Sequence, residues 1–153
     1  MAAGAYVAVV GDGRHDAPDT VLAAAEEVGA GAAEQGWIVV TGGEGGTMEA
    51  ACRGAKSRRG QTVGVLPGLD RASANGWVDI ALPTGLGELR NGLVVRAADV
   101  VVAVGGGHGT LSEIALALKL GRPVVGLATW DVHGIEQAAS PGDAIQRVAR
   151  LLS

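Results

Sequence analysis

Short apolar runs alternate along the chain with longer segments rich in alanine and leucine. The short runs are apolar at nearly every position, which is typical of parallel strands covered on both faces. They predict strands at 5–10, 37–40, 62–67, 78–83, 99–104 and 123–128. Strands that alternate with helices in this way predict an α/β fold, a three-layer, Rossmann-like, doubly wound parallel sheet.

Helix signals fill the segments between these runs. The sequence predicts helices from Asp16 or Pro18 to Gln35 and at about 46–58, 86–97, 109–120 and 141–152. A proline just inside the first and last of these segments is typical of a helix start. The 86–97 segment has one apolar face, made of Leu86, Leu89, Leu93, Val94 and Ala97. Residues 129–140 are the least readable part of the chain.

Length and composition indicate one globular domain. The chain has 153 residues, of which 48% are hydrophobic and 18% charged, so we expect residues 1–153 to form a single nucleotide-binding-type domain. Cys52 is the sole cysteine, which excludes an internal disulfide, and we expect it to be a small buried apolar side chain. The three histidines lack metal-ligand spacing, so no metal site is expected.

Charge and hydropathy argue against two classes of partner. A net charge of −4 disfavours nucleic acid, whose phosphates require a basic stripe. The N-terminus lacks the basic start of a signal peptide, and no apolar stretch approaches the ~20 residues of a membrane span. We therefore expect a cytoplasmic protein that binds neither nucleic acid nor membrane.

A glycine pattern, G-G-x-x-G-T, occurs twice, each time after a predicted strand and at the start of a predicted helix. Glycine lets main-chain N–H groups approach an anion, and the helix N-terminus adds about half a positive charge. Two such loops predict a ligand held between them, with phosphate on one or both. The expected phosphate-binding residues are Gly42, Gly43, Glu44, Gly45, Gly46 and Thr47 in the first loop, and Gly105, Gly106, Gly107, His108, Gly109 and Thr110 in the second.

Other nucleotide signatures are absent. The chain contains no GxxxxGK[ST], which excludes a P-loop NTPase. The loop GDGRHD lacks the third glycine of a dinucleotide fingerprint, and the second strand ends at Thr41 instead of an acid, so NAD is not expected. Weaker candidates for ligand contact are Gly11, Asp12, Arg14, His15 and Met48.

Glu113, after the second loop, has two interpretations. Together with Thr110 it fits the capping box T-x-x-E, in which the glutamate bonds back to the start of the helix. That interpretation leaves the neighbouring glycines unexplained. A carboxylate beside an anion site can instead accept hydrogen bonds from ribose hydroxyls or stabilise an oxocarbenium-like centre.

Arg90 and Asn91 are the polar candidates ahead of the second loop, and both lie off the apolar face of the 86–97 helix. Arg90 is either a solvated side chain or the counter-charge of Glu113. With Asn91 it has the chemistry of a fork for phosphate or sugar.

A resemblance to the molybdenum cofactor carrier and lonely-guy (LOG) superfamily covers about residues 5–128. It is carried by QGWIVVTGGEGGTMEAACRGAKSRRGQTVGVLPG and by RNGLVVRAADVVVAVGGGHGTLSEIALALKLGRPVVGL. LOG enzymes are phosphoribohydrolases with the motif PGGxGTxxE and an upstream arginine. The resemblance therefore implies that Glu113 and Arg90 match their catalytic residues.

The carrier branch is the nearer likeness, as GWIVVTGG, GAKSRRGQTVGVLPG and EIALALKLGRPVV indicate. Val104 or Gly105 stands in place of the proline of the LOG motif, and Asn91 stands where the enzymes usually have lysine. Carriers bind the molybdenum cofactor, a phosphorylated pterin with a dithiolene-held metal, without transforming it. The resemblance implies this cofactor as a carried ligand, with no cofactor required for catalysis.

Three functions follow as alternatives. The protein carries or senses a phosphorylated pterin, it hydrolyses nucleoside 5′-monophosphates to base and ribose 5-phosphate, or it is a regulatory protein with a vestigial site. Superfamily members are also labelled possible lysine decarboxylases, but Lys56 and Lys119, the only lysines, lie at predicted helix ends, away from the glycine loops. We expect a homodimer or homotetramer.

Overall fold

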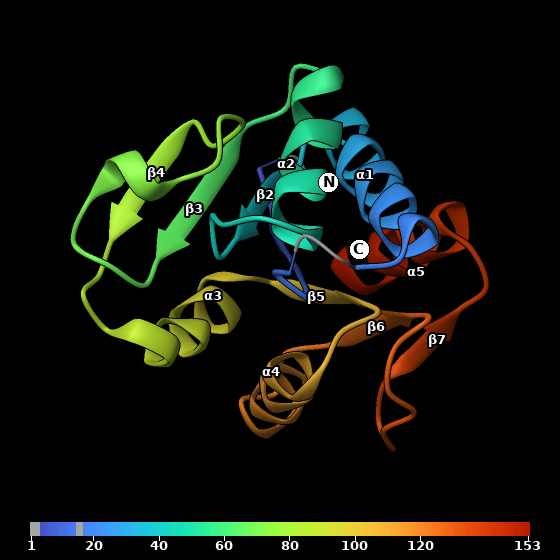
Figure 1. The fold of residues 1–153 in the computed structure, drawn as a ribbon. Coiled ribbons are helices and arrows are strands. Elements are labelled where there is room, and N and C mark those ends of the chain that lie inside the picture. The colour runs from blue at the N-terminus through green and yellow to red at the C-terminus, as the bar shows by residue number, and fades with distance from the viewer. Residues whose placement is uncertain (1–3, 15–16) are drawn as a thin grey trace.

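The computed structural model describes residues 4–14 and 17–153. At its centre lies a seven-stranded sheet in the order β4-β3-β2-β1-β5-β6-β7, and every neighbouring pair is parallel (Figure 1). The strands are β1 (Tyr6–Gly11), β2 (Ile38–Thr41), β3 (Thr62–Leu66), β4 (Ile80–Pro83), β5 (Val100–Val104), β6 (Val124–Leu127) and β7 (Glu136–Ala138).

Helices cover both faces of the sheet (Figure 1). One face carries α1 (Asp19–Glu34), α2 (Thr47–Ser57) and α5 (Pro141–Leu152), and the other carries α3 (Asn91–Ala97) and α4 (His108–Lys119). Two short 3-10 helices are η1 (Arg71–Ser73) and η2 (Gly87–Arg90). The predicted three-layer, doubly wound α/β fold is confirmed.

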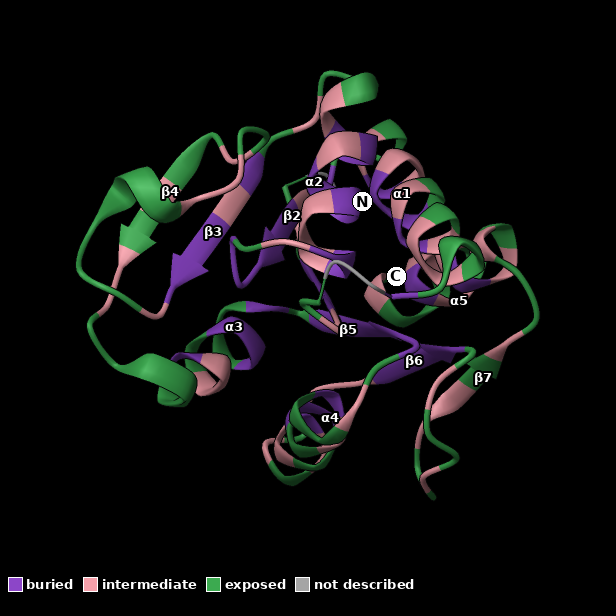
Figure 2. Cartoon of the chain, in the orientation of Figure 1, coloured by how far each residue is buried: buried purple, intermediate pink, exposed green. Residues whose placement is uncertain are grey.

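The central strands are buried on both faces, which explains why their sequences do not alternate. Every residue of β5 is buried (Figure 2). Val100, Val102 and Val104 belong to the apolar cluster beneath α1, α2 and α5. Val101 and Ala103 belong to the cluster on the opposite face, beneath α3 and α4.

Helices α1 and α2 pack with their backbones in near contact. A Cβ built on Gly29 would lie 2.0 Å from the Ala51 carbonyl oxygen, and one built on Gly54 would lie 1.9 Å from that of Glu26. Any side chain at these positions would force the helices apart, so both glycines serve helix packing. Cys52 lies on the same helix α2 and is fully buried, as expected.

The order of the strands reverses at β1, which lies between β2 and β5. Strands β2 to β4 extend the sheet in one direction, and β5 to β7 extend it in the other. In parallel sheets a crevice forms beyond the carboxyl ends of the strands at such a reversal. The segments that follow β1 and β5 therefore meet at the end of the sheet formed by the carboxyl ends of the strands.

The predicted 86–97 helix divides in two. Gly85 and Gly87 have φ values of +68° and +61°, and this left-handed backbone prevents an α-helix from starting at residue 86. Residues Gly87–Arg90 form the 3-10 helix η2, and the seven-residue α3 follows directly from Asn91. In α3 the fully buried residues are Val94 and Val95, whereas the leucines exposed nearby are Leu86, Leu89 and Leu93. The prediction of one continuous apolar face over residues 86–97 is therefore wrong.

Residues 129–140 contain a strand that the sequence did not predict. This strand, β7, has three residues, forms one edge of the sheet and pairs with β6. Glu136 and Gln137 are polar, so no apolar run marks it. The six predicted strands are all present, although the fourth begins at Ile80 and not at Val78.

Candidate functional site

A cleft of about 1130 Å³ opens beyond the carboxyl end of β1, where the order of strands reverses. Its walls come from the loop after β1, the junction of η2 and α3, and the second glycine loop with the first turns of α4. The predicted site residues that line it are Gly11, Asp12, Arg14, Glu44, Met48, Arg90, Asn91, Gly107, His108, Gly109, Thr110 and Glu113. The fold thus gathers predicted site residues from four separate segments at one cleft.

The second glycine loop turns the chain so that the N-terminus of α4 faces the cleft. Gly105 and Gly106 have φ values of +58° and +103°, and a Cβ built on Gly106 would lie 2.2 Å from Thr110 Oγ1. Gly107 is the N-cap, and Leu111 N donates to its carbonyl at 3.0 Å. The three α4 amides that precede Leu111 have no main-chain acceptor among the described residues. Such amides, aligned with the helix dipole, bind anions.

Glu113 is not part of a capping box. Helix α4 begins at His108, so Thr110 is its third residue and Glu113 its sixth, and its N-cap makes no side-chain hydrogen bond. The Glu113 side chain instead lines the cleft and is only 8% exposed. The capping interpretation is therefore wrong, and the carboxyl group lies one turn beyond the free amides.

Burial raises the pKa of Glu113 to about 7, while the positive charge of Arg90 acts in the opposite direction. Near neutral pH this carboxyl is therefore divided between its protonated and ionised forms. The protonated form does not repel a neighbouring anion as a carboxylate does, and it can donate a hydrogen bond. An acidic residue can thus lie beside an anion-binding helix end.

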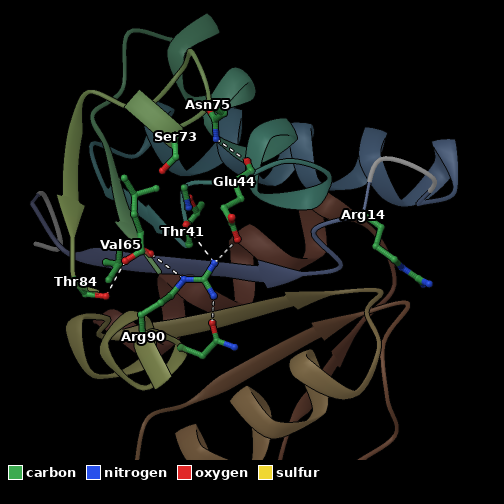
Figure 3. A network of polar contacts seen from close by, with 12 residues as sticks. Arg14, Thr41, Glu44, Val65, Ser73, Asn75, Thr84 and Arg90 are labelled. Atoms are coloured by element: carbon green, nitrogen blue, oxygen red, sulfur yellow. Dashed lines mark hydrogen bonds and ion pairs between the residues drawn. The ribbon is translucent and has the colours of Figure 1, made fainter. Parts of the chain in front are cut away.

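Arg90 is buried in the wall of the cleft, with only 6% of its surface exposed, and its guanidinium group connects η2 with β3 and the first glycine loop (Figure 3). It donates to Val65 O at 2.9 Å, to Asn91 Oδ1, to Gly42 O at 3.4 Å and to Glu44 Oε1 at 2.8 Å. The solvated interpretation of Arg90 is wrong. Its ion pair is with Glu44, and its positive charge also acts on Glu113, as the counter-charge interpretation predicts.

The first glycine loop is packed against its neighbours. A Cβ built on Gly43 would lie 2.6 Å from Leu66 Cδ2, one on Gly46 would lie 2.5 Å from Asp12 O, and Thr47 N donates to that same oxygen at 2.9 Å. Of residues 42–48, those that line the cleft are Glu44 and Met48. Those outside its lining are Gly42, Gly43, Gly45, Gly46 and Thr47. Gly43 and Gly46 therefore have a packing role, which the sequence pattern alone did not distinguish from ligand binding.

The loop after β1 contributes Gly11, Asp12 and Arg14 to the cleft lining. Arg14 forms an ion pair with Asp12 at 2.6 Å, and its hydrogen bonds lower the pKa of that carboxyl. In Figure 3 the Arg14 side chain points away from Arg90. The remaining candidate of this loop, His15, lies outside the described residues.

Trp130 is a cleft residue that the sequence did not reveal. It follows β6, and its Nε1 donates to Gly107 O at 3.0 Å. Its ring stacks on His108, with centroids 5.9 Å apart and an angle of 24° between the planes. A tryptophan just beyond the end of a predicted parallel strand was the available signal, because ligand sites form at those ends.

Neither lysine lines the cleft, since Lys56 and Lys119 lie in the last turns of α2 and α4. In residues 4–14 and 17–153, no three His, Cys, Asp or Glu side chains gather where they could hold a metal ion. Over the same ranges, no helix has both the length and the apolar character needed to cross a membrane.

Comparison with known proteins extends the likeness over nearly the whole chain. The SLOG cluster4 family model matches residues 4–151. An uncharacterized protein of Archaeoglobus fulgidus is 41% identical over 140 residues, which is 91% of each chain. The molybdenum cofactor binding protein of the phototrophic bacterium Rippkaea orientalis superposes with a TM-score of 0.93 at 37% identity over 98% of each chain. The Moco carrier protein of Chlamydomonas reinhardtii has a TM-score of 0.90 at 40% identity, over 97% of this chain and 98% of the other.

These relatives include named molybdenum cofactor carriers, so the predicted resemblance to such carriers is confirmed. The match to the family model begins before β1 and ends within α5, so it includes every strand of the sheet and the cleft. The chain belongs to the SLOG cluster4 family.

Proposed function

We propose that this protein binds a phosphorylated, pterin-containing molecule in the cleft and carries it without transforming it, and that this ligand is the molybdenum cofactor. The observation that carries the proposal is the free N-terminus of α4, which opens into the cleft beside Glu113. The structural likeness to molybdenum cofactor binding and carrier proteins supports the identity of the ligand.

The phosphate would bind at the first turn of α4. The amides of His108, Gly109 and Thr110 supply three donors, and glycine at the N-cap leaves room for an anion because it has no side chain. A helix of 12 residues also contributes its dipole at this end. The cleft volume of about 1130 Å³ exceeds the ~300 Å³ of the smallest ligand pockets, so a molecule larger than phosphate fits beyond this point.

Glu113 would contact the part of the ligand next to the phosphate. With a pKa of about 7 it accepts a hydrogen bond when ionised and donates one when protonated, so it can match either a hydroxyl or a ring nitrogen. Arg90 would act indirectly. Its donors are directed at protein oxygens, which holds Glu44 and Asn91 in the cleft wall, and its charge keeps the pKa of Glu113 from rising further.

Hydrolysis of nucleoside 5′-monophosphates is a second candidate function. A buried carboxyl with a pKa of about 7 suits a residue that activates water and stabilises positive charge at the sugar. In that reaction the bond between C1′ and the base breaks, the water oxygen joins C1′, and the base leaves with a proton. Ionised Glu113 would stabilise the oxocarbenium-like centre, and the α4 amides would hold the 5′-phosphate.

One experiment separates the two functions. Purified protein is incubated with AMP, GMP and CMP while free base is followed by chromatography, beside a Glu113→Gln variant. The carrier proposal predicts that no base is released. It also predicts that molybdenum and oxidised pterin co-purify with the protein from cells that make the cofactor. Base released by the wild type and not by Glu113→Gln would establish the hydrolase instead. If no base is released and no cofactor co-purifies, the result would favour a regulatory protein with a vestigial site.

A further inference from the structure

We propose that Trp130 and His108 form a platform on which the planar ring system of the ligand stacks. The inference rests on the proposed binding of a phosphorylated pterin-like molecule, and it assigns the position of the ring. The two side chains come from different elements, the loop after β6 and the first turn of α4, and they meet with ring centroids 5.9 Å apart in the cleft lining.

The indole of Trp130 is held in place at several points. The indole Nε1 donates to Gly107 O at 3.0 Å, and the main-chain carbonyl of Trp130 accepts from Gln137 Nε2 at 3.1 Å. The preceding Thr129 donates from Oγ1 to Gly105 O at 2.5 Å. The bonds to Gly105 and Gly107 join the loop after β6 to the second glycine loop, and the Gln137 bond joins it to β7. An aromatic ring that is already immobilised loses little conformational entropy when a ligand stacks on it.

Trp130 keeps part of its surface open in the lining of the cleft. The residue is 37% exposed, although its only polar side-chain atom is already bonded within the protein. The chain has three tryptophans, and Trp37 is almost completely buried in the core. Covering the open indole with a flat heteroaromatic ring removes apolar surface from water and adds stacking, and every pterin or purine has such a face.

The platform lies directly beside the proposed phosphate site. His108 is the first residue of α4, and the indole nitrogen bonds to the N-cap carbonyl of that helix. Trp130 also lines a neighbouring cleft of about 430 Å³, together with Gly105 and Gly106. A ring stacked here sits where the two clefts adjoin, within reach of a phosphate bound at the α4 amides.

The test uses three probes and matched variants. Neopterin monophosphate carries both ring and phosphate, glycerol 3-phosphate carries only the phosphate, and neopterin carries only the ring. Dissociation constants are measured by calorimetry for the wild type, Trp130→Ala and Trp130→Phe. Trp77→Phe serves as the control for fluorescence, because Trp77 is also partly exposed but does not line the cleft.

We expect the wild type to bind neopterin monophosphate at least tenfold more tightly than glycerol 3-phosphate. Trp130→Ala should weaken neopterin monophosphate about tenfold and leave glycerol 3-phosphate unchanged, and Trp130→Phe should retain most of the affinity. Quenching of tryptophan fluorescence by neopterin monophosphate should persist in Trp77→Phe and be largely lost in Trp130→Phe.

Two results would overturn the platform while leaving the phosphate site intact. One is equal affinity of the wild type for neopterin monophosphate and glycerol 3-phosphate. The other is an equal loss for both probes in Trp130→Ala, which would mean that the indole only holds the second glycine loop. If neopterin binds as tightly as neopterin monophosphate and glycerol 3-phosphate does not bind, the result would support the platform and contradict the proposed phosphate site.

Discussion

Arg90 Nη2 lies 2.8 Å from Glu44 Oε1, and this ion pair joins the 3-10 helix η2 to the first glycine loop. The arginine is almost completely buried, whereas the glutamate side chain is 47% exposed. The guanidinium group therefore matters mainly for the carbonyl groups it satisfies behind the cleft, and less for the ion pair itself.

This asymmetry predicts unequal effects of two substitutions on stability. Arg90→Ala should lower the free energy of unfolding by about 2 kcal/mol, because it removes a buried donor to the carbonyls of Val65 and Gly42. Glu44→Gln should cost less than about 1 kcal/mol, since its side chain stays hydrated. Urea denaturation of both variants measures the difference. Equal losses would mean that the ion pair dominates.

The buried carboxyl of Glu113 predicts a dependence of stability on pH. The pKa of Glu113 is about 7 in the folded protein, compared with an ordinary value of 4.5 that applies to the unfolded chain. As the pH rises, Glu113 therefore ionises first in the unfolded chain. The shifted pKa of Glu113 contributes to the free energy of unfolding in full below about pH 4.5. This contribution, about 3 kcal/mol in total, is lost as the pH rises through 7.

Glu113→Gln cannot ionise and should lack this loss. The free energy of unfolding, measured from pH 4.5 to 8, should therefore fall for the wild type relative to the variant by about 3 kcal/mol. A difference that stays constant over this range would show that Glu113 has an ordinary pKa.

The close contact of α1 and α2 predicts that Gly54 does not tolerate a methyl group. Gly54→Ala places a Cβ 1.9 Å from Glu26 O and should destabilise the protein by at least about 2 kcal/mol. Gly92→Ala is the matched control, because the nearest atom to its Cβ is Leu116 Cδ2 at an ordinary 3.5 Å. Alanine favours a helix over glycine, so this control should be neutral or stabilising. Thermal unfolding that ranks the two variants alike would contradict the packing account.

The strand runs were predictable because burial on both faces demands continuous apolar residues, as in β5. Strand β7 was not, since an edge strand with Glu136 and Gln137 carries no such demand. The late start of α3 was also missed, because a glycine such as Gly87 prevents an α-helix only if its φ is positive, and the sequence does not specify φ.

Part of the candidate site could be predicted from local pattern. The second glycine loop and Glu113 share one helix start, so their proximity follows from the sequence. The packing of Gly43 and Gly46 depends on partners in β3 and in the loop after β1. In the sequence, a glycine that packs against another backbone segment cannot be told from one that contacts a ligand. Trp130 reaches the site through a turn at Ala128, whose φ of +52° is rare for a residue other than glycine.

The expected homodimer or homotetramer has a suitable surface in the exposed leucines Leu69, Leu86 and Leu89, which we name the leucine patch. Leu69 is 87% and Leu89 is 78% exposed, and Leu89 extends the patch to the edge of the cleft. A second copy of the chain would remove this apolar surface from water.

We therefore expect Leu69→Glu to reduce self-association, measured by sedimentation or by light scattering after size exclusion. Leu151→Glu, on α5 in the opposite layer, is the control and should leave the oligomer intact. An oligomer that survives Leu69→Glu, or a wild type that is monomeric, would exclude the leucine patch as the interface.

The most direct test of the central claim places a charge at the proposed phosphate site. A side chain at Gly109, in the first turn of α4, has open space around its Cβ, so Asp and Asn both fit and differ only in charge. Affinity for neopterin monophosphate is measured for the wild type, Gly109→Asn and Gly109→Asp. We predict that Gly109→Asn binds within about threefold of the wild type and that Gly109→Asp binds at least tenfold more weakly, because two like charges would lie a few ångströms apart. Equal binding by all three proteins would contradict the claim that the phosphate binds at the N-terminus of α4.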